Sequence, residues 1–186
     1  RANLSKLYQP KHLFVVDKFP RSGIGKVNRK VLEDSYQQRI QAEKVALYRI
    51  RLPFKKPFKT PKETLRFREV ILVEVTDHNG RTGLGECSSF LTDWYLPETL
   101  NVDEYILRER LAPLVLSTPL LHPSEAESLF ATYPELEDYP LARAAIEEAL
   151  WDLYGKIVKK PLWQLLGGDT SGLARRPLIH GANLSE

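Results

Sequence analysis

Apolar and small residues recur at three- and four-residue steps between residues 141 and 157, the most regular pattern in the chain. This spacing puts them on one side of an α-helix, so it predicts a helix with a broad apolar face. The Gly167-Gly168 pair is expected to end the helical segment. Because small residues let a neighbouring element approach closely, we expect this face to lie under a second layer of structure. The face comprises Leu141, Ala142, Ala145, Ile146, Ala149, Leu150, Leu153 and Ile157.

Three shorter segments have the β-branched or alternating pattern of strands. They are Val45–Leu52, Glu69–Thr76 and Arg81–Glu86. The Asn79-Gly80 pair between the last two is a strong hairpin signal, because both residues tolerate positive φ. Prolines follow the first strand at positions 53, 57 and 61, and they predict a basic loop over Phe54–Glu63. The segments therefore predict a three-stranded antiparallel meander.

Two helices are expected after the meander. Asn101 is a candidate cap for a helix that runs to about Leu111, with Pro113 ending it. Val102, Ile106 and Leu107 are expected on its inward side. Ser124 and Glu127 have the spacing of a capping box for a second helix that reaches about Thr132. Strands followed by helices predict an α+β fold.

Several residues that invite a chemical interpretation are better explained structurally. The glycines of Gly83-Leu84-Gly85-Glu86 lack the third glycine of a dinucleotide loop, since Ser88 stands there, so we expect a bulge or close packing. Cys87 has no basic neighbour in sequence and is predicted to be a buried structural thiol. Glu147 and Glu148 are adjacent, so they point in different directions and are expected on the wet side of the long helix.

The first 44 residues differ from the rest in charge. They carry 10 Lys and Arg against 4 Asp and Glu, a net charge of +6, whereas residues 45–186 carry 17 against 20, a net charge of −3. This break predicts a domain boundary near residue 44. The segment has no basic stripe interleaved with aromatic residues and no helix-turn-helix pattern, so we expect no nucleic-acid partner. It begins with a predicted strand at Leu13–Val16 and ends with a predicted helix at Val27–Arg39, with Val27, Val31 and Leu32 inward.

A glycine turn between these two elements delivers one lysine. Arg21-Ser22-Gly23-Ile24-Gly25-Lys26 lets a backbone approach a ligand closely and presents Lys26 as a point charge for a carboxylate or phosphate. It is not a Walker A loop, because Val27 occupies the position that needs Ser or Thr. For these residues taken alone, a solvated turn with a surface lysine is the favoured explanation.

Bulk composition describes an ordinary folded protein. Hydrophobic residues make up 42% and charged residues 27% of the 186, and no apolar run approaches the ~20 residues of a membrane span. The single cysteine excludes an internal disulfide and favours a reducing compartment, so we expect a cytoplasmic protein. The chain contains no Met. We interpret it as an internal piece of a longer reading frame, with a trimmed chain as the alternative.

The run PKHLFVVDKFPRSGIGKVNRKVL resembles the C-terminal end of acyl-CoA synthetases of the adenylate-forming superfamily, over roughly residues 8–40. The resemblance implies that Lys26 contacts the acyl carboxylate and the adenylate phosphate. ATP and CoA would be the cofactors of the complete ligase. Ser22 departs from the Thr or Asn that is commoner there.

Two separated blocks, Pro57–Thr99 and Ala142–Gly168, resemble the N-terminal capping domain of the enolase superfamily. Gly85-Glu86-Cys87, Trp94-Tyr95 and Glu98-Thr99 are most similar to its o-succinylbenzoate synthase and N-succinylamino-acid racemase members. The resemblance divides the chain into a ligase-like tail at 1–44, a capping domain at 45–162 and the start of a β/α barrel at 163–186. The barrel would then be the layer that covers the long helix.

The superfamily resemblance implies Mg²⁺ as cofactor and a small-molecule carboxylate as substrate, with metal ligands and a basic lysine on barrel strands. No metal ligand is expected in this chain, and RPLIHGAN at Arg176–Asn183 resembles only the first barrel strand. Two capping-domain loops, Thr60–Arg66 and Ser89–Tyr95, would close over the barrel and set specificity. Their candidate residues are Thr60, Lys62, Thr64, Arg66, Phe90, Thr92, Trp94 and Tyr95. The first loop departs from the commoner glycine-containing version, which leaves synthase and racemase open.

The two resemblances together favour the synthase, because its product is the acid that o-succinylbenzoate–CoA ligase activates. A fusion of the two enzymes, joined at Ser35–Lys44, accounts for both. We expect the 186 residues alone to be inactive. Two alternatives remain: a non-catalytic module that binds a partner through the face at Leu141–Ile157, and an anion-binding arm built on the first segment. An oligomer is possible, and no membrane partner is expected.

Overall fold

The computed structural model describes residues 19–23 and 25–169. The chain divides into two compact units, Arg1–Gln38 and Arg39–Glu186. The predicted strand at residues 13–16 and the predicted barrel strand at residues 176–183 lie outside the described residues. Within residues 19–23 and 25–169, none of the helices combines the length and apolarity that crossing a bilayer requires.

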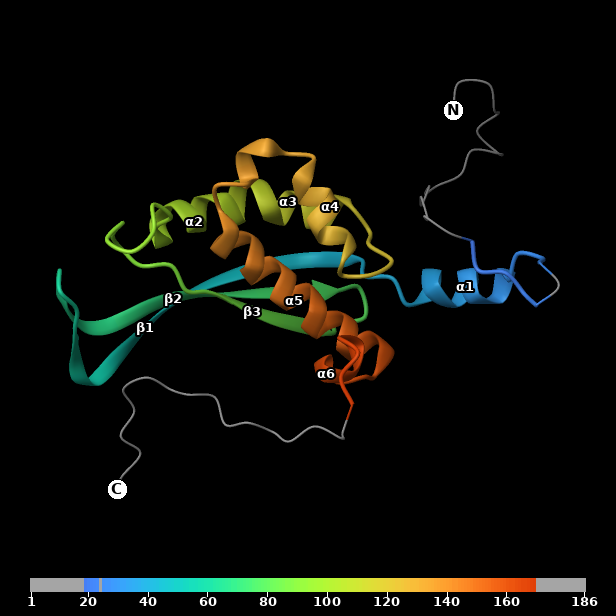
Figure 1. The fold of residues 1–186 in the computed structure, drawn as a ribbon, viewed down its shortest axis with the longest axis horizontal. Helices are drawn as coiled ribbons and strands as arrows, with labels where there is room; N and C mark the ends of the chain where they lie inside the picture. Colours follow the sequence, from blue (N-terminus) through green and yellow to red (C-terminus); the bar gives the residue numbers. More distant parts are fainter. Residues whose placement is uncertain (1–18, 24, 170–186) are drawn as a thin grey trace. The chain divides into compact units, whose positions relative to one another are not determined.

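The second unit is built on a three-stranded antiparallel sheet, as predicted (Figure 1). β1 (Ala42–Lys59), β2 (Thr64–Asp77) and β3 (Thr82–Cys87) follow one another in space in chain order. The ladder pairs Leu47 with Val73 and Val73 with Gly85. The Asn79-Gly80 turn is present, and the buried Asp77 carboxylate accepts the backbone N–H groups of Asn79 and Arg81 at 2.9 Å each. This turn fixes the register of the second hairpin.

The expected loop over residues 54–63 is wrong for residues 54–59, and only residues 60–63 form a loop. β1 continues to Lys59 and β2 begins at Thr64, so the two strands form a long hairpin arm that runs past the helices (Figure 1). Pro53 and Pro57 are tolerated because β1 is an edge strand, in which one row of backbone groups needs no partner. The pairing is irregular at two places in β1, between Ala42 and Lys44 and between Pro53 and Phe58.

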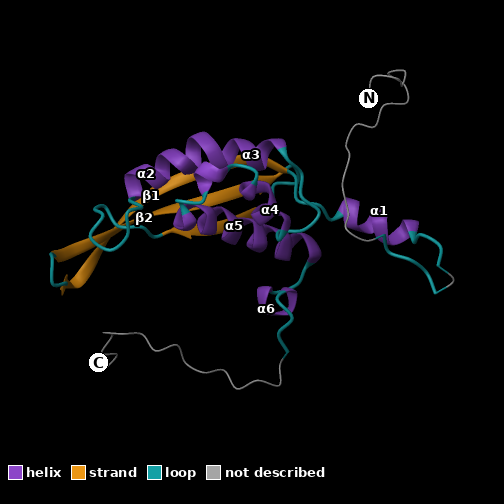
Figure 2. Cartoon of the chain, turned by 45° about the horizontal axis from the view of Figure 1, so that its top comes forward, coloured by secondary structure: helices purple, strands orange, loops and turns teal. Residues whose placement is uncertain are grey.

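Helices cover one face of the sheet (Figure 2). α2 (Leu100–Ile106) continues through one π turn (Leu107–Leu111) into α3 (Ala112–Ser117). Two predictions fail here: Thr99, not Asn101, precedes the helix, and Pro113 does not end it. In the wider π turn Ala112 N–H donates to the Leu107 carbonyl, which lets the helix run on through Pro113. Ile106 and Leu107 are buried as expected, whereas Val102 is exposed.

The predicted capping box before α4 (Glu125–Ala131) is also wrong. Ser124 has helical backbone angles and makes no cap bond, and its hydroxyl pairs with His122 Nδ1 at 2.8 Å. Glu125, rather than Glu127, reaches back, and its carboxylate accepts the Leu121 N–H at 2.8 Å. A 3₁₀ turn (Pro134–Leu136) follows the helix.

α5 (Pro140–Val158) is the predicted long helix, and its apolar face is covered by this chain's own sheet. Ala145, Ile146, Ala149 and Leu150 are fully buried against β2 and β3. The expectation that a barrel covers this face is therefore wrong. So is the alternative of a partner-binding module, because no exposed apolar face remains on α5 to receive a partner.

Glycines in β3 allow the close approach of α5. Of the two predicted explanations for these glycines, a bulge or close packing, the structure has close packing. A Cβ on Gly83 would lie 2.0 Å from the Ala149 carbonyl oxygen. The helix ends at Val158, where Lys159 takes a left-handed conformation with φ of 55°. The Gly167-Gly168 pair therefore follows a separate short helix, α6 (Leu162–Leu165), and does not end α5.

Polar side chains of α5 cover the free edge of β3. Asp152 accepts the Leu84 N–H at 2.9 Å, and Glu148 accepts the Glu86 N–H at 3.0 Å. Lys156 Nζ donates to the Thr82 carbonyl at 2.7 Å. An open edge is a template for unwanted pairing, so this cover protects the sheet. Glu148 is exposed, as expected for the wet side of α5, and its carboxylate also bonds β3.

The first unit contains α1 (Arg29–Gln37), whose N-terminus is capped by Asn28 through a 3.3 Å bond from Val31 N–H. The helix has no buried residue. Val27 and Val31, predicted to face inward, are 41% and 43% exposed. The described part of this unit therefore has no core of its own.

Candidate functional site

The first predicted loop is the tip of the hairpin arm. Thr60 closes it: its N–H donates to the Glu63 carbonyl at 2.8 Å, and its hydroxyl accepts the N–H groups of Lys62 and Glu63 at 3.3 and 2.9 Å. Threonine hydroxyls suit such turns because they replace backbone partners locally. Only residues 60–63 form the loop, since Thr64 and Arg66 already belong to β2.

The second predicted loop is a closed excursion between β3 and α2. At its neck, Leu100 N–H donates to the Phe90 carbonyl at 2.8 Å, and Phe90 forms a parallel bridge with Thr99. Aromatic rings hold its interior together: Phe90 lies edge-on to Trp94 at 4.7 Å and to Tyr95 at 6.0 Å between centroids. Such edge-on pairs add to the stability of the packed loop.

The structure brings the two loops together, although they lie about thirty residues apart in the chain. Lys62 Nζ donates to the Trp94 carbonyl at 3.2 Å. The Thr92 hydroxyl donates to the Glu63 carboxylate at 3.4 Å. Both bonds are exposed, so each can break and re-form at little cost. The predicted specificity residues thus gather into one surface feature.

Arg68, which sequence analysis did not single out, forms the wall behind the loops. Its guanidinium stacks 3.9 Å from the Phe90 ring centroid and donates to the Ser88 carbonyl. Burial lowers the pKa of Arg68 below its usual range, but the group stays protonated at neutral pH. No sequence signal marked it, since the contact joins a strand to a loop twenty residues later.

Two hollows open on either side of this wall. The first has a volume of about 270 Å³ and lies between the arm and Phe90, with Arg66 at its rim. The second has a volume of about 250 Å³ and extends from Arg68 past Tyr95 to Glu98. Arg66, Arg68 and Phe90 suit a small anion with an apolar body, and the carboxylates of Glu63 and Glu69 also line the first hollow. Within residues 19–23 and 25–169, no group of three or more His, Cys, Asp and Glu side chains is placed to hold a metal ion.

A buried polar cluster lies beneath the second loop. The Glu98 carboxylate, 5% exposed, accepts the N–H groups of Leu141 and Ala142 at the start of α5 at 2.9 and 3.0 Å. Asp103 is fully buried beside it and accepts the Cys87 thiol at 3.3 Å. Burial, together with the neighbouring Asp103, raises the pKa of Glu98 to about 7 against two opposing backbone hydrogen bonds. Sequence analysis quoted Glu98 only as part of a motif and did not single out Asp103, because the burial of both carboxyls depends on tertiary packing.

Cys87 is expected to be inert in the native protein. Burial and the adjacent Asp103 raise the pKa of its thiol to about 12, so the reactive thiolate is scarce at neutral pH. We predict that a chromogenic disulfide reagent at pH 8 labels Cys87 only after denaturant is added, with full labelling of the unfolded chain as the control. Stoichiometric labelling of the native protein within minutes contradicts this prediction.

Lys26 lies in the first unit, on the exposed turn before α1. The turn is closed by Ser22 N–H, which donates to the Lys26 carbonyl at 2.7 Å, and by a bridge between Arg21 and Val27. Gly25 supplies the positive φ of 79° that the turn requires. The Lys26 side chain is exposed.

Residues 43–167 match the family described as mandelate racemase / muconate lactonizing enzyme, N-terminal domain. The chain belongs to this family. The match covers the meander, the helical layer and α5, so the two loops described above are those of a capping domain of the enolase superfamily. The resemblance to this superfamily drawn from the sequence is confirmed.

Individual relatives agree with the family. The chain is 42% identical to an o-succinylbenzoate synthase from Geobacillus kaustophilus over 129 residues, covering 69% of this chain and 34% of the relative. It is 32% identical to an N-succinylamino acid racemase from Thermus thermophilus, covering 70% and 34%. A solved structure of an enolase-superfamily member from Enterococcus faecalis superposes with a TM-score of 0.63 at 32% identity, covering 69% and 34%. The chain thus spans about a third of the length of these relatives.

Proposed function

We propose that the protein containing this chain is an o-succinylbenzoate synthase, a lyase of the enolase superfamily, and that these residues form its specificity cap. The carrying observation is the meeting of the two loops through Lys62–Trp94 and Glu63–Thr92, with Arg68 behind them. A cap that reads a substrate needs its recognition residues in one place, on a scaffold that holds them. The 42% identity to a synthase supports this choice of activity.

In this proposal the cap recognises substrate and excludes water but performs no proton transfer. Arg66 and Arg68 attract a carboxylate, and the rings of Phe90 and Tyr95 cover an apolar substrate body. Closure of Thr60–Glu63 and Ser89–Tyr95 over the substrate strengthens these contacts by removing water. Thr64 contributes to the rim of the first hollow. The proton abstraction belongs to a barrel domain that we propose to begin at residue 163.

Mg²⁺ is the metal that the superfamily implies, and when bound it would stabilise negative charge that develops on the substrate. The acidic residues described here do not fit it. The Glu98 oxygens already accept backbone N–H groups, and Asp103 faces a thiol, whereas Mg²⁺ requires an octahedral set of oxygens with room for water. We therefore assign no metal ligand and no step through the metal to these residues.

The remaining assignments extend the same proposal. Residues 1–44 would be the tail of an acyl-CoA ligase related to o-succinylbenzoate–CoA ligase. In it Lys26 would contact the acyl-adenylate, with ATP and CoA as the ligase cofactors. Residues 45–162 would be the cap. The single cysteine supports a reducing, cytoplasmic location. The family match begins at residue 43, so the tail rests on sequence resemblance alone.

N-succinylamino-acid racemisation is the second candidate, favoured by the 32% identity to the Thermus thermophilus racemase. Racemisation would require the cap to recognise the same group, because both substrates carry a succinyl carboxylate. The first loop reads Pro61-Lys62-Glu63-Thr64 instead of the commoner glycine-containing version. An activity assay therefore has to decide between the synthase and the racemase.

The full reading frame is expected to catalyse Mg²⁺-dependent dehydration to an aromatic acid. The ultraviolet absorbance of that acid measures the reaction. The 186 residues alone are expected to show no dehydration activity. Chelation of the metal should abolish turnover, and added Mg²⁺ should restore it. Racemisation of N-succinyl-phenylalanine, followed by polarimetry, is the parallel assay. A full-length protein that binds Mg²⁺ and turns over neither substrate contradicts the proposal.

A further inference from the structure

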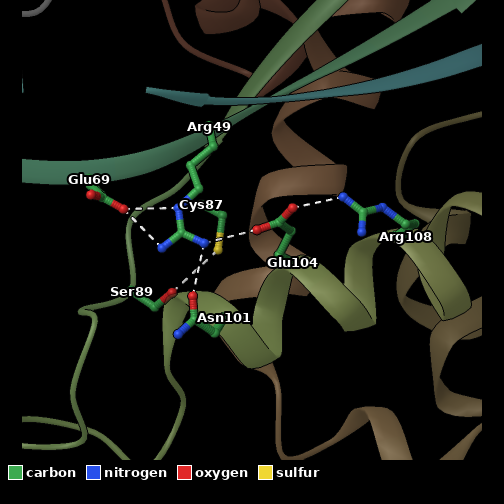
Figure 3. A network of polar contacts seen from close by, with 7 residues as sticks. All are labelled: Arg49, Glu69, Cys87, Ser89, Asn101, Glu104 and Arg108. Carbon is green, nitrogen blue, oxygen red and sulfur yellow. Dashed lines mark hydrogen bonds and ion pairs between the residues drawn. The ribbon is translucent and has the colours of Figure 1, made fainter. Parts of the chain in front are cut away.

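A polar clamp centred on Arg49 joins the hairpin arm to the helical layer (Figure 3). Its Nε and Nη2 atoms both bind Glu69 Oε2 of β2 at 2.9 Å. Its Nη1 atom donates to Asn101 Oδ1 at 2.8 Å and to Glu104 Oε2 at 3.0 Å, both on α2. One guanidinium therefore holds two strands and a helix at once. The planar fork of arginine suits this role, which a lysine ammonium cannot reproduce.

The clamp lies where the arm leaves the core. Arg49 pairs in register with Ile71, which is fully buried, so its side chain faces the helical layer. Beyond it, every residue of β1 from Arg51 to Lys59 is exposed. Arg49 is consequently the last polar side chain of β1 that bonds the helices, in the part of the chain that the structure describes.

The same clamp also reaches the support of the second loop. Asn101 and Glu104 lie on the first turns of α2, which starts directly after the loop neck formed by Phe90 and Thr99. The base of the arm and the root of the second loop are thus bonded to the same guanidinium. The contacts at the loop tips, between Lys62 and Trp94, form only if these two supports keep their relative angle.

A lever estimate indicates how much the clamp matters. The arm extends ten residues from Arg49 to Lys59, or ~33 Å at about 3.3 Å per residue. A tilt of ~2° at its base therefore moves the tip by ~1 Å. Recognition sites require placement to ~0.5 Å, and ~1 Å of error costs up to ~100-fold in activity. A small change in the tilt of the arm at Arg49 therefore produces a large displacement of Lys62 at its tip.

We propose that Arg49 is a positioning residue for substrate specificity, which fixes the arm and its loop against α2 and the second loop. This assignment rests on the proposed function for its effect on the substrate, but its effect on the loops is independent of any activity. Arg49 touches no substrate in this arrangement. It acts through Glu69, Asn101 and Glu104, and the loops transmit its effect.

The test compares three variants of the full reading frame. Arg49→Met removes the fork and keeps the apolar stem, and Arg49→Lys keeps the charge alone. Arg108→Met is the matched control, because the Arg108 side chain is 59% exposed and, among the described residues, its one side-chain bond is to Glu104, at 2.7 Å. Hydrogen exchange followed by mass spectrometry reports on three segments: residues 60–66, residues 89–99, and residues 70–75 in the core of β2.

In Arg49→Met, exchange is expected to be faster by roughly tenfold in both loop segments and unchanged in residues 70–75. KM for N-succinyl-phenylalanine or for the dehydration substrate is expected to rise roughly tenfold, with kcat within about threefold of wild type, because the loops contribute binding. Arg49→Lys should fall between wild type and Arg49→Met. Arg108→Met should match wild type in both measurements.

Equal acceleration in all three segments would show that Arg49 only stabilises the fold, and it would overturn the proposal. Unchanged exchange in the loops overturns it as well. A wild-type protein without turnover overturns the proposed activity instead, and the exchange measurement still decides the role of Arg49. If turnover is normal and KM does not change while the loops loosen, the specificity part of the proposal fails.

Discussion

Replacing Gly85 with Ala is expected to destabilise the second unit by about 3 kcal/mol or more, because the added methyl group has no space. A Cβ at this position would lie 2.0 Å from the Ala145 carbonyl oxygen and 2.9 Å from the Ala149 nitrogen. Both atoms are α5 backbone, so no side-chain rotation relieves the overlap. The helix must move away from β3, and the contacts between the two elements are the centre of the core.

Urea unfolding of the chain, followed by circular dichroism, measures this loss. Leu84→Ala is the matched control: it changes the residue next to Gly85 in the same strand, but Leu84 is 49% exposed, so the expected change is within about 0.5 kcal/mol. Gly83→Ala should resemble Gly85→Ala, since its Cβ would meet Ala149 and Leu153. Two glycine variants as stable as Leu84→Ala would show that α5 does not pack this closely.

The elements that local pattern specifies were predictable. The period of the apolar residues from Leu141 to Ile157 reports burial of one helix face, and Asn79-Gly80 reports a tight hairpin turn. The partner of the helix was not predictable. The apolar period shows that one face of the helix is covered, but it does not show which element covers it. The prediction therefore assigned the face to a barrel, whereas the sheet of the same unit covers it.

Failures at Pro53, Pro57 and Pro113 share one cause. Proline removes a hydrogen-bond donor, and whether this interrupts an element depends on whether the donor was needed. At the edge of the sheet and after a π turn it is not needed. Edge position and helix widening are tertiary properties, so a local rule predicts a loop and a helix end where the structure has neither.

The candidate site was predictable only in part. The family resemblance located the loop residues, but the structure alone joins Lys62 to Trp94 and places Arg68 between the hollows. The clamp at Arg49 joins residues up to 55 positions apart. The burial of Glu98 and Asp103 also depends on the fold. Polar contacts of this kind carry no period, which explains why sequence patterns do not reveal them.

Raising the pH from 5 to 8 is expected to remove about 2 kcal/mol of stability that depends on the proton held by the Glu98 carboxyl. The pKa of Glu98 is raised from its ordinary value of 4.5 to about 7, chiefly by burial. The unfolded chain releases this proton near pH 4.5, while the folded chain keeps it to about pH 7. The stabilisation is therefore complete below pH 4.5, falls between the two values and is absent above pH 7. A full conversion gives ~3 kcal/mol, and water in the adjoining hollow screens part of it.

Glu98→Gln isolates this effect. The amide keeps an oxygen that accepts the N–H groups of Leu141 and Ala142, and it supplies an N–H toward Asp103 that does not titrate. His122 has a lowered pKa and Glu147 a raised one, both through burial, so they add slopes of opposite sign in the same range. These slopes are common to both proteins and cancel in the difference between wild type and Glu98→Gln. Urea unfolding at pH 5, 6, 7 and 8 should show that difference changing by about 2 kcal/mol in favour of the variant as pH rises. Parallel stability curves would mean that Glu98 holds no proton in the folded chain at pH 5 to 7, and the second loop would then be anchored to α5 by an ordinary charged cap.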